Sequence, residues 1–145
     1  MLIVLTKEVI SRIQLGAERA VEFLKKYSTQ VGEIAKNLEF SYAYLYCLLV
    51  LSQAILTMAN YLIVKLGLKI PRSFREALEI LIDEDVIPKD FEPQAKAIIE
   101  IRDMILHYWN ESAHDVIYSI TKDFSSIEEI YNLVKNQVNK VLEKE

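Results

Sequence analysis

Apolar residues recur at helical spacing along most of this chain, and the pattern predicts a series of amphipathic helices. A first long helix is expected from Leu2 to Tyr27, with a charged face opposite the apolar one. A short helix follows and ends near Leu38. The last helix, from about Ser126, presents one apolar face that comprises Ile127, Ile130, Tyr131, Val134 and Val138.

The stretch from Phe40 to Val64 contains no charged residue. A run of about 20 apolar residues is long enough to cross a bilayer, so a membrane helix is one interpretation. However, Gln53, Thr57 and Asn60 recur at helical spacing and form a polar seam along one side. We therefore favour the central helix of a bundle, buried on most sides, and expect Gly67 to end it in a left-handed cap.

Helix-start signals divide the second half of the chain. Ser73 is expected to cap a helix, with Glu76 completing a capping box three residues later. Asp90 is expected to cap the next helix, which extends to about Trp109. A further helix capped by Ser112 follows. The pattern thus predicts helices throughout and no strand.

Composition agrees with one helical domain. The chain has 145 residues, 52% of them apolar, with only three glycines and three prolines. That length is sufficient to bury a core, and the scarcity of turn-forming residues leaves few interruptions. We predict an all-α fold: a single up-and-down bundle of about five to six helices spanning residues 1–145.

Charge and cysteine content narrow the function classes. A net charge of −4 argues against a broad basic surface for nucleic acid, so any such contact must be local. Cys47 is the only cysteine, which excludes disulfides within the chain. The first residues lack the basic region of a secretory signal. We expect a cytoplasmic protein without a membrane span. The acidic run from Asp83 to Asp85 has no paired histidine and is interpreted as a solvated helix end, so no metal and no cofactor are predicted.

The candidate chemistry lies in the helix that ends near Trp109. Asp103 and His107 are four residues apart, so both lie on one face and the carboxylate can accept a hydrogen bond from the imidazole. Arg102 is five residues from His107, roughly 140° around the helix. Either the arginine wraps back, or the two groups meet across an interface with a second copy. The alternative is that all three are ordinary surface residues, with His107 stabilised by the helix dipole and His114 a solvent-facing bystander.

These features together resemble the HEPN superfamily, and within it the HepT-like branch of small ribonuclease toxins. That family is marked by an arginine, usually a polar residue next to it, and a histidine a few residues later, which here are Arg102, Asp103 and His107. The resemblance covers roughly residues 42–120. The residues that carry it before this motif are Gln53, Asn60, Gly67-Leu68, Pro71 and Ser73-Phe74.

The resemblance implies a metal-independent endoribonuclease toxin that cuts RNA, with Arg102 and His107 as the active-site pair and Asp103 holding the imidazole. A histidine can transfer the proton of a 2′-hydroxyl, and an arginine can stabilise the charge that develops on the phosphoryl oxygens. The expected product is a 2′,3′-cyclic phosphate. The family further implies a homodimer whose pairs face one cleft, and a minimal nucleotidyltransferase as the antitoxin of a type VII-like pair.

One departure concerns the tyrosine that the family's antitoxin modifies with AMP. The matching position, two residues after the histidine, is Trp109, whereas a tyrosine stands one residue earlier. Tyr108 is therefore the modification candidate, and the alternative is that both aromatic residues only pack at the helix end. A non-enzymatic substrate-binding subunit of a nucleotidyltransferase is the second functional interpretation, and activity that depends on His107 separates the two.

Overall fold

The computed structural model describes residues 5–107 and 124–145. Within these ranges every regular element is helical, as predicted. The elements are α1 (Lys7–Tyr27), η1 (Ser28–Gln30), α2 (Val31–Ala35), α3 (Leu38–Lys65), α4 (Phe74–Asp83), η2 (Lys89–Phe91), α5 (Glu92–His107) and α7 (Phe124–Glu143).

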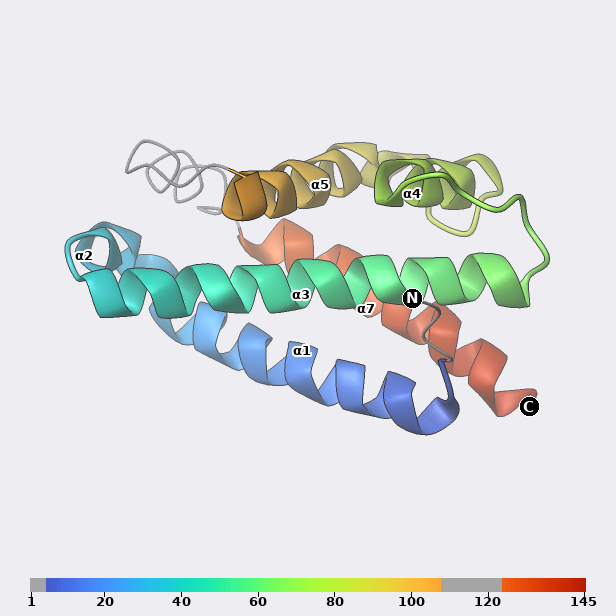
Figure 1. Cartoon of the computed structure of the whole chain (residues 1–145), viewed down its shortest axis with the longest axis horizontal. Helices are drawn as coiled ribbons and strands as arrows, with labels where there is room; N and C mark the ends of the chain where they lie inside the picture. Colours follow the sequence, from blue (N-terminus) through green and yellow to red (C-terminus); the bar gives the residue numbers. More distant parts are fainter. Residues whose placement is uncertain (1–4, 108–123) are drawn as a thin grey trace.

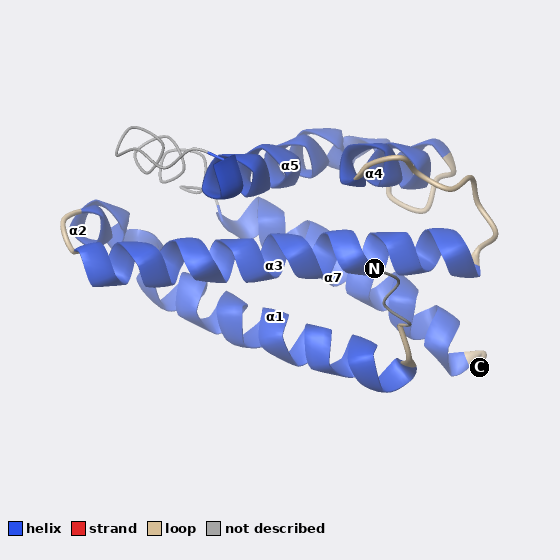
Figure 2. Ribbon diagram, in the orientation of Figure 1, coloured by secondary structure: helices blue, strands red, loops and turns tan. Residues whose placement is uncertain are grey.

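Helix α3 runs along the middle of the bundle (Figure 1). Helix α1 lies on one side of it, α4 and α5 lie on the other, and α7 crosses behind. α3 packs against all four of these helices. The long helices alternate in direction along the chain, which confirms the up-and-down bundle, and the described part contains only helices and connecting loops (Figure 2).

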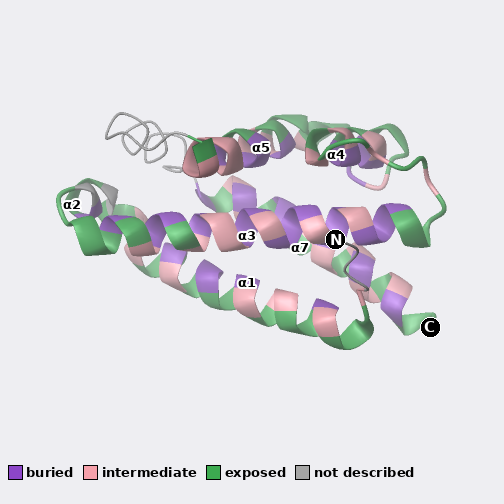
Figure 3. Ribbon diagram, viewed as in Figure 1, coloured by how far each residue is buried: buried purple, intermediate pink, exposed green. Residues whose placement is uncertain are grey.

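The central position of α3 explains why its residues 40–64 carry no charge. Side chains with no exposed surface follow one another along it, among them Tyr44, Leu51, Ile55 and Met58. By length and composition α3 could cross a membrane, yet 61% of its apolar window is buried inside the bundle. Figure 3 shows these buried positions along the helix where neighbours cover it. α3 is therefore the core helix that the polar seam predicted.

Capping side chains set the helix starts. The first helix begins at Lys7, so the expected start at Leu2 is wrong, because Thr6 caps it by accepting the backbone N–H of Val9 at 3.2 Å. Asn37 caps α3 in the same way, and the short helix before it ends at Ala35. Each cap satisfies a backbone donor that would otherwise lack a partner.

Ser73 caps α4 as expected, accepting the Glu76 N–H at 3.1 Å. The Glu76 carboxylate does not complete the expected box on Ser73, since it accepts the backbone N–H of Arg72 at 2.7 Å. It also pairs with Lys69 at 3.1 Å, and these donors lower the pKa of Glu76 to about 2. Asp90 lies inside the η2 turn, so it is not the cap of α5.

Two helices end in left-handed residues. Gly67 has φ +66°, and the N–H of Leu68 reaches the carbonyl of Ile63 at 3.0 Å, which confirms the predicted cap of α3. Asp85 has φ +59° at the matching position after α4, where the N–H of Val86 reaches the carbonyl of Leu81 at 2.9 Å. The second cap was not predicted, because its residue is not glycine.

Several expectations fall on residues outside the described ranges. They concern the end of the fourth helix at Trp109, the modification candidate Tyr108, the helix expected after Ser112, and His114. The last helix is within the described part and begins at Phe124, two residues before the expected start at Ser126.

Candidate functional site

Helix α5 carries Arg102, Asp103 and His107 in its last two turns. Its buried side chains, including Ile98 and Ile101, fix it against the core. The apolar stripe positions the neighbouring polar residues at the border of the bundle, as the spacing predicted. Arg102 and Asp103 are partly exposed, and His107 is exposed.

The Arg102 side chain is held by two residues, one from each of two other helices. Its Nε donates to Oε1 of Gln53 on α3 at 3.1 Å, and the Gln53 amide in turn donates to Oγ1 of Thr57 at 3.2 Å. Its guanidinium carbon lies 4.9 Å from the centre of the Phe74 ring at the start of α4. Only 22% of the side chain is exposed. A charged group held by an amide and an aromatic ring is fixed in direction before any ligand arrives.

Asp103 contacts Arg102 in this structure. Its Oδ1 lies 3.6 Å from Nη1 of Arg102, and 46% of its side chain is exposed. The hydrogen bond expected between Asp103 and His107 is not formed among residues 5–107 and 124–145. The two residues nevertheless share one face of α5, so a rotation of the Asp103 side chain is sufficient to bring them together.

The structure does not bring Arg102 and His107 together within one chain. Arg102 is directed towards α3 and α4, where Gln53 and Phe74 hold it. His107 is exposed at the end of α5 and makes no hydrogen bond or ion pair to the described part of the chain. Of the two possibilities that the spacing left open, the wrapped-back arginine is therefore not observed.

A groove of about 340 Å³ is lined in part by Gln53, which accepts the hydrogen bond from Arg102, and by Thr57. It lies between α1 and α3, and its lining includes Arg12, Tyr46, Gln53 and Thr57. Gln53 thus belongs both to this groove and to the support of Arg102.

The described residues contain no group of three or more His, Cys, Asp or Glu side chains placed to hold a metal ion. Tyr108 lies outside the described ranges, so its position relative to them is not assigned.

Sequence reasoning missed the residues that support Arg102. Gln53 and Thr57 were expected to form a polar seam, and Gln53 and Phe74 were named in the family resemblance, but none of them was connected with Arg102. A signal was present, because an amide in the middle of an uncharged core helix needs a hydrogen-bonding partner. The partner became visible only when folding placed α5 beside α3.

A family model described as Ribonuclease HepT-like matches residues 17–141. Two crystal structures of the toxin–antitoxin MntA–HepT, both mutants, have a similar fold. One matches with a TM-score of 0.74 and 15% identity over 90% of this chain and 99% of the other. The second has a TM-score of 0.63 and 17% identity over 88% and 94% of the two chains. No curated protein sequence matches.

Proposed function

Because this chain belongs to the HepT-like ribonuclease family, we propose that it is a metal-independent endoribonuclease of the cytoplasm and the toxin of a toxin–antitoxin pair. The two structures of similar fold are toxin–antitoxin structures. The observation that carries the proposal is the way Arg102 is held. A guanidinium fixed by Gln53 and Phe74 is suited to binding a phosphate, and the same helix carries an exposed His107 that can transfer a proton.

The proposed reaction uses the 2′-hydroxyl of RNA as the nucleophile. His107 accepts the proton of that hydroxyl, and the oxygen attacks the adjacent phosphorus. Negative charge develops on the phosphoryl oxygens, which Arg102 stabilises through its terminal nitrogens, since its Nε is occupied by Gln53. The bond to the 5′-oxygen breaks, and that oxygen takes a proton from a second imidazole. The products are a 2′,3′-cyclic phosphate and a 5′-hydroxyl.

A second imidazole is supplied if the active form is a homodimer. Arg102 and His107 of one chain diverge, so a cleft shared by two copies is the simplest way to place an arginine, a base and an acid around one phosphate. The outward face of α3 fits such a partner. It carries no charge from residue 40 to residue 64, and Tyr42, Tyr46 and Val64 are 59%, 66% and 73% exposed. Gln53, which binds Arg102, lies on the same stripe seven residues after Tyr46, so a two-fold axis there brings both arginines together.

The first experiment is cleavage of a labelled RNA in EDTA by the wild-type protein, Arg102→Ala and His107→Ala. Loss of a general acid or base is expected to lower the rate by about 10² to 10⁴. Loss of the charge-stabilising arginine is expected to lower it by about 10² to 10³. If folded wild-type protein leaves RNA intact, the ribonuclease proposal is refuted and the non-enzymatic binding subunit takes its place.

Mixing the wild type with an excess of the double variant Arg102→Ala/His107→Ala tests the shared cleft. Of the four functional side chains, a mixed dimer keeps one Arg102 and one His107, and these two belong to one chain. If the cleft needs the imidazoles of both chains, mixed dimers are inactive, so an excess of the double variant is expected to abolish the activity of the wild type. If both residues act from the same chain, each wild-type subunit keeps its activity in a mixed dimer.

We further propose a minimal nucleotidyltransferase as the antitoxin, with Tyr108 as the residue it modifies. Incubation with that enzyme and ATP is expected to add AMP to the wild-type chain and not to Tyr108→Phe, as measured by mass spectrometry.

Asp103 is proposed to hold the His107 imidazole during proton transfer. Asp103→Asn, which keeps the size of the side chain, is expected to change the pH dependence of cleavage more than RNA binding.

A further inference from the structure

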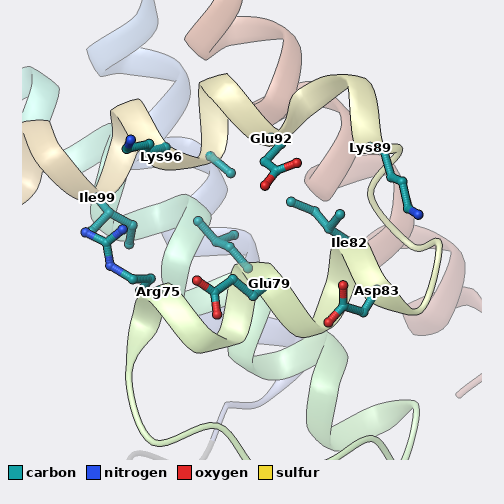
Figure 4. A pocket seen from close by; sticks show the side chains of 10 residues that line it. Arg75, Glu79, Ile82, Asp83, Lys89, Glu92, Lys96 and Ile99 are labelled. Carbon is teal, nitrogen blue, oxygen red and sulfur yellow. The ribbon is translucent and has the colours of Figure 1, made fainter.

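A second cavity, of about 330 Å³, lies between α4 and α5. Its floor is apolar, with Leu78, Ile82, Ala95 and Ile99, and six charged side chains surround it. Figure 4 shows Arg75 and Lys96 beside Ile99 at one end, Glu79 opposite Glu92 in the middle, and Asp83 with Lys89 at the other end. None of the six forms an ion pair or hydrogen bond with another described residue. Their charges are thus available to a ligand.

The basic end of this cavity adjoins the candidate site on both helices. On α5, Lys96, Ile99, Asp103 and His107 follow one another at intervals of three or four residues, so they form one stripe. On α4, Arg75 directly follows Phe74, whose ring contacts the Arg102 guanidinium. A strand bound at Arg102 and His107 can therefore continue along α5 towards Arg75 and Lys96.

The distance suits a short single strand. Lys96 and His107 are 11 residues apart, which corresponds to about 16 Å along the helix axis. A few nucleotides of extended RNA cover this distance. Beyond Lys96 the acidic side chains of Glu79 and Glu92 repel a phosphate backbone, so the strand has to leave the cavity there.

We propose that Arg75 and Lys96 bind the phosphates of the RNA strand that flanks the cleavage position, a few nucleotides from Arg102, and that Glu79 and Glu92 end this contact. This inference rests on the proposed ribonuclease function and deepens it. It also gives an acidic chain a local basic contact for RNA, because Arg75 and Lys96 adjoin the candidate site.

The test measures binding of a 2′-O-methyl RNA oligonucleotide, which keeps its phosphates but lacks the attacking hydroxyl. Fluorescence anisotropy gives Kd from 50 to 300 mM salt. For single strands each phosphate contact contributes about 0.7 to the slope of log K against log salt, or about fivefold in affinity at 0.1 M salt. Arg75→Gln with Lys96→Gln is expected to lower the slope by about 1.4 and weaken binding about 25-fold.

Lys89→Gln is the matched control for Lys96→Gln alone, because each removes one positive charge and Lys89 lies at the far, acidic end of the same cavity. It is expected to leave the slope unchanged. Glu79→Gln with Glu92→Gln is expected to strengthen binding of longer oligonucleotides more than of short ones.

Weakening by Lys89→Gln as large as that by Lys96→Gln alone overturns the inference, since the effect is then one of overall charge. Unchanged RNA binding by the double variant also overturns it. If that variant instead loses self-association or binding to the nucleotidyltransferase, the cavity is a protein interface. If the wild type cleaves RNA in any of these cases, the proposed function stands. If it neither binds nor cleaves RNA, both proposals fall.

Discussion

Replacing Gln53 by leucine tests whether the site depends on a pre-positioned arginine. The substitution keeps the approximate volume of the side chain and removes the oxygen that accepts the Arg102 Nε–H at 3.1 Å. A hydrogen bond to a charged group contributes about 1.5–3 kcal/mol. Because 22% of the Arg102 side chain is exposed, water can replace part of this bond, so the lower value applies. About 1.5 kcal/mol of lost positioning corresponds to roughly a tenfold lower rate.

The assay is single-turnover cleavage of labelled RNA, with circular dichroism to establish that each variant is folded. Asn60→Leu is the matched control, since Asn60 lies on the same polar seam but makes no hydrogen bond to Arg102. Thr57→Val removes only the hydroxyl that orients Gln53, and its effect is expected to be smaller. Gln53→Glu keeps an acceptor and is expected to retain activity.

Two results would refute this reasoning. An unchanged rate for Gln53→Leu means that Phe74 and solvent are sufficient to position the arginine. A loss as large as that of Arg102→Ala means that Gln53 contacts the substrate itself and is more than a support.

Three further predictions concern stability and reactivity. Asp85→Gly is expected to raise the free energy of unfolding by about 0.5–1 kcal/mol, because the φ of +59° at this position suits glycine. The control Glu84→Gly, at a φ of −91°, is expected to lower that free energy. Urea unfolding of both variants measures the two changes. The pKa of Glu76 is about 2 in the fold against 4.5, so its stabilising contribution is present above about pH 4.5 and disappears as the pH falls towards 2. Thermal melts are thus expected to show the deficit of Glu76→Gln shrinking over that interval, and a deficit that stays constant with pH contradicts this. Burial raises the pKa of Cys47, so iodoacetamide is expected to alkylate it slowly at pH 8 until urea unfolds the chain; fast alkylation of the native protein contradicts this.

The fold was largely predictable because its signals are local. Helical spacing of apolar residues, the Ser73 cap and the left-handed Gly67 each depend on a few neighbouring residues. The boundaries were less accurate where two signals competed. Thr6 starts α1 later than the apolar pattern indicated, and Asp90 lies in a 3₁₀ turn although its residue type suits a cap. The left-handed Asp85 was missed because aspartate adopts that conformation only when the surrounding hydrogen bonds impose it.

The sequence by itself determined the all-helical class, the buried central helix and the candidate residues Arg102, Asp103 and His107. It determined these because periodicity and residue type act over one or two turns of helix. Tertiary structure alone decided that Gln53 and Phe74 hold Arg102, that Arg102 and His107 diverge, and that Arg75 and Lys96 lie at one end of a cavity. Those contacts join residues far apart in the chain, and their geometry depends on how the helices pack against α3 rather than on any local pattern.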